Sequence, residues 1–137
     1  MIILLGGIVL SVLLGQGEFK YRVVEDWAKL PDEWSFMDVA GVAVNSKDEV
    51  YVFNRGEHPM IIFDINGNYL RSWGKNLFLR PHGIHIGPDD HIYCTDDGDH
   101  TVKKISPDGK LIFQIGVPGK PSEFMSNLPF HRCTHTA

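Results

Sequence analysis

The chain repeats itself at an offset of 42 residues, counted from Gly41 to Gly83. The segment from Gly41 to Gly74 aligns with the segment from Gly83 to Gly116 without a gap. Several turn and strand positions are identical in the two copies: Asp48/Asp90, Tyr51/Tyr93, His58/His100 and Gly67/Gly109. A repeat of this length indicates an architecture in which copies of one small structural unit pack side by side.

Each unit is expected to form four short strands. In the first unit the β-rich runs are GVAV, EVYVF, MIIFD and YLRSWG, and the turn residues NSKD and NGN separate them. The second unit repeats the pattern with GIHI, HIYCT, VKKIS and LIFQIG, and no stretch shows a sustained helical period. Four strands in about 42 residues is typical of one β-propeller blade. We therefore predict an all-β fold, an incomplete propeller.

The repeat also sets the expected boundaries. We predict one blade over residues 38–79, a second over 80–121, and the start of a third over 122–137, where THTA aligns with PHGI. Propellers have four to eight blades, so the smallest ring needs about 170 residues. We expect a fragment that needs missing blades or self-association to cover its open edges.

The N-terminal region is expected to lie outside the blades. Residues 1–14 are an apolar leader or extension that is too short to span a bilayer comfortably. They have no preceding Lys or Arg and no small-residue cleavage site after them, so either a signal segment for secretion or a plain extension is possible. Residues 15–37 are predicted to be an edge strand and linker, because Phe19, Tyr21 and Val23 alternate with Lys20 and Arg22.

Composition excludes some functions. The net charge is −4 and the basic residues are scattered, so there is no electrostatic footprint for nucleic acid. Cys94 and Cys133 lie far apart and not in a metal-binding spacing. We expect two unpaired, largely buried thiols, which favours a reducing, cytoplasmic location.

Two stretches carry a family resemblance. VYVFNRGEHP and GKNLFLRPHGIHIGPDDHIYCTDDGDHTVKK resemble the NHL-repeat propeller of the peptidyl-α-hydroxyglycine α-amidating lyases and their bacterial relatives. The similarity covers residues 41–121, and FNRGEH and GKNLF with PHGI are its most specific parts. It implies a six-bladed ring with a catalytic zinc on its axis and a structural calcium nearby. It also implies a carbon–nitrogen lyase that splits a peptidyl-α-hydroxyglycine into a peptide amide and glyoxylate.

The resemblance extends to single residues. It implies that His82 of PHGI binds zinc, that the backbone carbonyls of Val42 and Ile84 contact calcium, and that Arg55 of NRGEH is an active-site arginine. The family's other two zinc histidines, its catalytic tyrosine and its calcium-binding aspartate belong to later blades, which this chain does not include.

Physical chemistry is consistent with a ligand role for His82. The first strand of each blade lines the central channel, so a residue at its start faces the axis, where an open tetrahedral zinc site can form. The alternative is a histidine packed at the channel mouth and bonded to a backbone carbonyl. Arg55 could hold a substrate carboxylate in a fork, or it could be a surface arginine paired with Glu57 or Asp97.

Other polar residues are weaker candidates. His135 matches His82 in the third unit and is either a ligand or incidental channel lining. His58 and His100 are repeat-equivalent, which favours a structural role. We expect the acidic turn of the second unit to be a solvated loop; it contains Asp96, Asp97 and Asp99.

Two classes of function follow. The first is a zinc-dependent lyase that acts on a peptide or small molecule. The second is a non-catalytic NHL propeller that binds a protein or small ligand on its face, since such folds host many functions. A calcium-dependent propeller of the lactonase type is a third.

Overall fold

The computed structural model describes residues 21–137, and this range contains eight strands and no helix. The first four strands are β1 (Val39–Val44), β2 (Val50–Asn54), β3 (Met60–Phe63) and β4 (Tyr69–Trp73). The second four are β5 (Pro81–Ile86), β6 (Ile92–Asp96), β7 (Thr101–Ile105) and β8 (Leu111–Ile115). The prediction of an all-β fold is confirmed.

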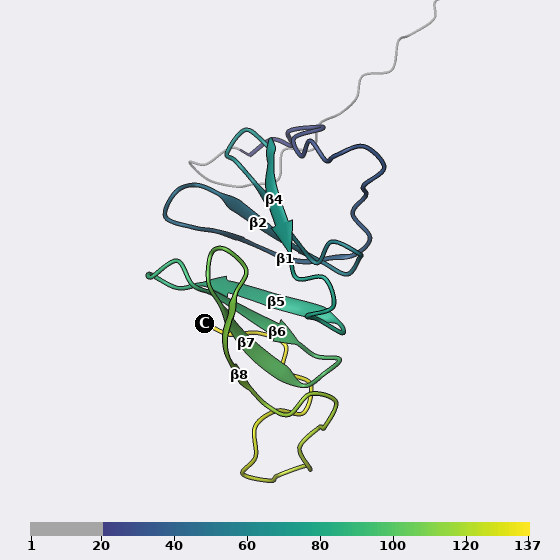
Figure 1. The fold of residues 1–137 in the computed structure, drawn as a ribbon, viewed down its shortest axis with the longest axis vertical. Helices are drawn as coiled ribbons and strands as arrows, with labels where there is room; N and C mark the ends of the chain where they lie inside the picture. Colours follow the sequence, from purple (N-terminus) through teal and green to yellow (C-terminus); the bar gives the residue numbers. More distant parts are fainter. Residues whose placement is uncertain (1–20) are drawn as a thin grey trace, which may run out of the picture.

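The strands form two separate antiparallel sheets, which we call blade 1 (β1–β4) and blade 2 (β5–β8) (Figure 1). In each sheet the strands lie in sequence order, as a meander. The registers repeat: Val39 pairs with Asn54 in blade 1, and Pro81 pairs with Asp96 in blade 2, each beside an irregularity. This repeat of strands and register agrees with the two four-stranded units predicted from the sequence.

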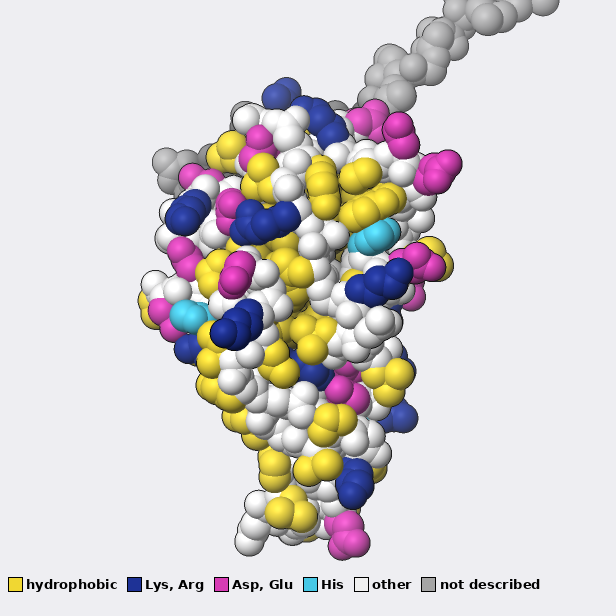
Figure 2. Space-filling view, in the orientation of Figure 1, with side chains coloured by type: hydrophobic (Ala, Val, Ile, Leu, Met, Phe, Trp, Pro, Cys, Tyr) yellow, Lys and Arg dark blue, Asp and Glu magenta, His cyan; other side chains and the backbone are white. Residues whose placement is uncertain are grey.

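The blades pack face to face through a shared apolar core. Tyr51, Phe53 and Met60 of blade 1 are fully buried, and they lie in one cluster with Ile92 and other side chains of blade 2. Burial of large aliphatic and aromatic side chains is the main force that holds such layers together. Figure 2 shows hydrophobic side chains along the middle of the molecule, with charged side chains toward its two sides.

Two repeat-equivalent glycines let the innermost strands approach each other. A Cβ atom at Gly41 would lie 2.9 Å from Cγ2 of Ile84 on the neighbouring inner strand. A Cβ atom at Gly83 would collide with the carbonyl oxygen of Thr134. Thr134 therefore packs against β5 in the same way as β5 packs against β1. Residues 122–137 nevertheless contain no regular strand. That these residues begin a third blade stays a prediction.

Residues 21–37 differ from the predicted edge strand. Their one β-bridge in the described range joins Lys29 to Asn68. The reason is burial: Trp27, Trp34 and Phe36 pack across the apolar face of blade 1 that blade 2 does not cover. The apolar leader, residues 1–14, lies outside the described residues, as do residues 15–20 of the predicted strand. From residue 21 onward no helix is long and apolar enough to cross a membrane.

Candidate functional site

His82 lies at the beginning of β5 and is half-buried. Its Nδ1 atom is 3.0 Å from the carbonyl oxygen of Thr134. A carbonyl oxygen only accepts hydrogen bonds, so Nδ1 carries the proton and Nε2 keeps its lone pair. Metal-binding histidines are commonly held in this way, with one ring nitrogen donating to a carbonyl and the other on the metal. The carbonyl bond of the structural alternative is thus present, and it leaves Nε2 without a proton, so the ligand role of His82 stays a prediction.

Arg55 lies directly after β2, in the turn that leads to β3, and is exposed. Its Nε atom donates to the carbonyl oxygen of Pro81, 2.9 Å away, which is the residue immediately before His82. The structure thus brings the two predicted site residues to the same end of neighbouring blades. In the described range Arg55 makes no ion pair with Glu57 or Asp97, so the predicted surface pairing is absent there.

Asp97 is the repeat equivalent of Arg55 and carries the opposite charge. Arg80 donates to both carboxylate oxygens of Asp97, with Nε 2.7 Å from Oδ1 and Nη2 bonded to Oδ2. The Arg80 guanidinium lowers the pKa of Asp97, and the charges of His82 and Arg55 add smaller contributions. Such bidentate pairs fix both groups in one plane. The sequence analysis did not identify this Arg80–Asp97 pair; the change of charge between repeat-equivalent positions was the signal that could have revealed it.

Asp96 holds the segment that leads to His82. Its carboxylate accepts hydrogen bonds from the backbone amides of Leu79, at 2.5 Å, and Arg80, at 2.9 Å. The backbone amides of Gly98 and Asp99 also donate to it. Asn54 does the equivalent work in blade 1, where its side-chain oxygen accepts from the amide of Met37. The Asp96 carboxylate therefore holds the backbone at Leu79 and Arg80, directly before β5 begins at Pro81.

The acidic turn is not a solvated loop, and that expectation is wrong. Asp96, Asp97 and Asp99 are 0%, 6% and 8% exposed. The buried ammonium group of Lys103 lies 2.7 Å from Asp99 Oδ2 and 4.0 Å from Asp96 Oδ2, and Arg80 pairs with Asp97. Buried carboxylates need such partners, because an uncompensated charge in the interior is costly.

The residues proposed for calcium lie on adjacent inner strands. Val42 is on β1 and Ile84 is at the equivalent position of β5. Because the two inner strands touch at Gly41, these backbone positions are neighbours near the face where the strands meet. In residues 21–137 no group of three or more His, Cys, Asp or Glu side chains could hold a metal ion. His82 therefore belongs to no such group in the described range, and its role as a zinc ligand stays a prediction.

The remaining histidines and thiols have structural contacts. His58 stacks on Trp34 with the ring centroids 3.3 Å apart, and Nδ1 of His100 accepts from the backbone amide of Arg132. Cys94 and Cys133 are unpaired, and Cys94 is buried while Cys133 is partly so. Burial raises the pKa of the Cys94 thiol well above its usual value, so this thiol is a core residue and a poor nucleophile.

The two repeated four-stranded meanders, with a histidine at the start of β5, are consistent with blades of an incomplete β-propeller. No family model matches the chain. Human NHL repeat-containing protein 3 is 32% identical over 120 residues, which cover 80% of this chain and 34% of the relative. Rat peptidylglycine alpha-amidating monooxygenase is 30% identical over 122 residues, which cover 69% of this chain and 12% of the relative.

A shorter match is to a protein that is named as a lyase. Fruit-fly peptidyl-alpha-hydroxyglycine alpha-amidating lyase 1 is 38% identical over 58 residues, 40% of this chain and 11% of the relative. The chain is a homologue of NHL repeat-containing protein 3 and of the peptidylglycine α-amidating enzymes. It spans about a third or less of the length of these curated relatives.

Proposed function

We propose that the two blades are part of a zinc-dependent lyase that cleaves peptidyl-α-hydroxyglycines. The observation that supports this most is the contact of His82 Nδ1 with the Thr134 carbonyl, because it leaves the Nε2 lone pair available for a metal. The homology to α-amidating lyases supports the substrate class. Further ligands would come from other blades of a closed ring, and structural calcium would bind the carbonyls of Val42 and Ile84.

In this proposal each residue of the chain has a limited task. When bound, zinc supplies a Lewis acid that favours loss of a proton from a hydroxyl group near neutral pH. His82 holds one position of that centre. Arg55 orients the substrate by binding the carboxylate of the substrate. The Arg55 Nε bonds to the Pro81 carbonyl, and the two Nη groups form the fork that receives the carboxylate. Breaking the carbon–nitrogen bond then yields an amide and glyoxylate.

The test uses a protein in which these blades sit in a closed ring, measured for bound zinc and for glyoxylate release. We expect His82→Ala to lose both zinc and turnover. We expect Arg55→Ala to keep zinc and lose substrate affinity by about tenfold or more, as for a lost charge-assisted bond. Zinc binding that survives His82→Ala would contradict the ligand assignment, and unchanged kinetics in Arg55→Ala would contradict the orienting role.

A non-catalytic NHL propeller is the second candidate. The observation in its favour is that the match to NHL repeat-containing protein 3 covers more of this chain than the matches to the lyases described above. A closed ring that is folded but neither binds zinc nor releases glyoxylate would favour this candidate.

A further inference from the structure

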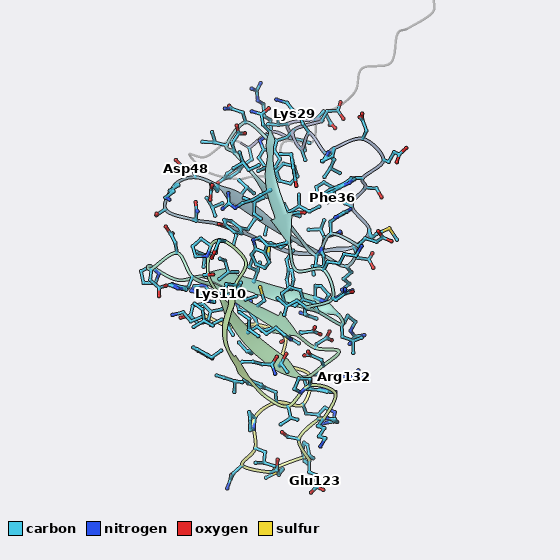
Figure 3. The ribbon with its side chains drawn as sticks, viewed as in Figure 1. Lys29, Phe36, Asp48, Lys110, Glu123 and Arg132 are labelled. Carbon is cyan, nitrogen blue, oxygen red and sulfur yellow. The ribbon has the colours of Figure 1, made fainter. Side chains whose placement is uncertain are left out.

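A second cluster of cationic side chains lies beside the Arg55–His82 site. The chain has five arginines, and three of them, Arg55, Arg80 and Arg132, lie at the end of the blades where β5 begins. Figure 3 labels Arg132 at this end of blade 2. The acidic turn lies at the same end, and Arg80 and Lys103 pair with it, which leaves Arg55 and Arg132 without an ion-pair partner in the described range.

Arg80 and Arg132 line one hollow. It has a volume of about 290 Å³ and is lined by Leu79, Arg80, Asp97, Gly98, His100 and Arg132. Arg55 and His82 are not in its lining, so the hollow is separate from the proposed zinc and substrate residues.

Two of the side chains around the hollow, His100 and Arg80, are oriented by hydrogen bonds to their neighbours. Nδ1 of His100 accepts the backbone N–H of Arg132, 3.1 Å away, so the ring proton of the neutral imidazole is on Nε2. Arg80 uses Nε and Nη2 on Asp97. In the described part of the chain, neither Nη1 of Arg80 nor the Arg132 guanidinium has a hydrogen-bond partner.

The one carboxylate in the lining, Asp97, offsets the charge of Arg80 and leaves the charge of Arg132. Asp97 is 6% exposed and both of its oxygens accept from Arg80. Behind it, Asp99 is neutralised by the buried Lys103. The solvent-facing groups of the hollow are therefore N–H donors, with Arg132 contributing a positive charge that has no protein counter-charge in the described range.

We propose that the hollow between Arg80 and Arg132 is a second anion-binding subsite, which takes the side-chain carboxylate of an acidic residue in a peptide lying across this face. The occupant is a peptide because this inference rests on the proposed function, whose substrates are peptides. A planar carboxylate fits the fork geometry of a guanidinium better than a spherical anion does. The subsite would thus favour peptides with Asp or Glu near the cleaved end.

The experiment is an NMR titration of the 137-residue chain with three probes: N-acetyl-glutamate methylamide, its neutral glutamine analogue, and inorganic phosphate. We expect the glutamate probe to shift the backbone signals of Gly98, His100 and Arg132, and the glutamine probe to leave them in place. Arg132→Gln should weaken binding of the glutamate probe at least tenfold, the loss of about one charge-assisted hydrogen bond. Arg132→Lys should give a smaller loss, because charge remains but the fork is gone.

A matched control identifies the hollow. Lys120→Gln should leave the affinity unchanged, since the Lys120 side chain does not line it. Equal shifts with the glutamine probe, binding of phosphate without binding of glutamate, or an unchanged affinity in Arg132→Gln would each overturn the proposal. None of these outcomes depends on zinc or on turnover, so the subsite proposal can be wrong while the proposed lyase function stands.

Discussion

At the scale of residues, the two blades hold their equivalent leading segments in place with side chains of different charge. Blade 2 fixes its leading segment with the Asp96 carboxylate and buries Lys103 beside it, with 2% of Lys103 exposed. Blade 1 uses the neutral Asn54 at the position of Asp96, and Ile61 at the position of Lys103. The buried charges of Asp96 and Lys103 in blade 2 therefore have neutral equivalents in blade 1.

Lys103→Ile should destabilise the fold by about 3 kcal/mol, because it leaves Asp96 and Asp99 buried without a counter-charge. Adding Asp96→Asn, which makes the pair match blade 1, should recover part of that loss. Lys104→Gln is the control, since Lys104 is a less buried neighbour paired with Asp89 near the surface and should cost less than about 1 kcal/mol. Urea unfolding measures all three, and a Lys103→Ile cost no greater than that of the control would contradict the account.

A second ion pair links stability to pH. Arg71 donates two hydrogen bonds to Glu49, at 2.8 and 2.9 Å, and holds the pKa of Glu49 at about 2, below its usual 4.5. A carboxyl whose pKa falls on folding adds stability above its unfolded pKa and loses it as pH drops through the folded value. The contribution is therefore complete above pH 4.5 and disappears toward pH 2.

Glu49→Gln should lower the free energy of unfolding at pH 7 by about 1 kcal/mol, a value that allows for the partial exposure of the pair. The difference from the unmodified chain should shrink steadily between pH 4.5 and pH 2. Unfolding curves at pH 7, 4 and 2 test this. A difference that stays constant with pH would show that the loss arises from packing and not from the ion pair.

At the scale of elements, the strands could be predicted from the sequence, but the segments that pack over the sheets could not. The gapless repeat, with glycine and aspartate at turn positions, was enough to predict eight short strands, because turn chemistry and alternation are local signals. Burial of residues 27–36 over blade 1 was not predictable in this way, since it depends on which apolar face is left open after the blades pack. The buried acidic turn was missed for the same reason: its partners Arg80 and Lys103 are brought in by strand pairing.

Of the candidate site, the placement of Arg55 beside His82 could be predicted from the repeat. Arg55 follows the second strand and His82 begins the next inner strand, so an antiparallel meander brings both to one end. The contact with Thr134 could not be predicted, because nothing local in the sequence places residues 122–137 against β5.

Gly83→Ala should be costly, by about 2 kcal/mol, because the new Cβ would meet the backbone oxygen of Thr134 and also Oγ1 of Thr95, at 2.7 Å. Gly41→Ala is the matched change in blade 1 and should cost less, since its nearest obstacle is the tip of the Ile84 side chain. Thermal unfolding gives the comparison. Equal costs would mean that the close approach of residues 134–135 to β5 does not occur in solution.

At the scale of the whole molecule, the two blades are covered unequally. The outer face of blade 1 is packed by Trp27, Trp34 and Phe36. On blade 2, by contrast, strand β8 and the short segment after it expose Phe113, Ile115 and Val117, which are 45%, 43% and 55% exposed. An uncharged, apolar edge strand such as LIFQI is a favourable surface for association with another chain.

The chain should therefore associate as its concentration rises, and Phe113→Lys should reduce that association. Phe124→Lys is the control, because Phe124 is 93% exposed but lies in the C-terminal segment away from β8. Sedimentation velocity over a range of concentrations measures the effect. A chain that stays monomeric at every concentration, or an equal effect of the two substitutions, would rule out β8 as the contact.

The orientation of the His82 ring also depends on the whole molecule, because its partner Thr134 comes from the C-terminal segment after blade 2. The most direct measurement is the tautomer of His82, read from long-range proton–nitrogen NMR correlations of the 137-residue chain at about pH 8, well above the pKa of a free histidine. We predict a single Nδ1–H tautomer with an unprotonated Nε2. A dominant Nε2–H tautomer, or a mixture of the two, would contradict the orientation on which the zinc site and the proposed lyase function rest.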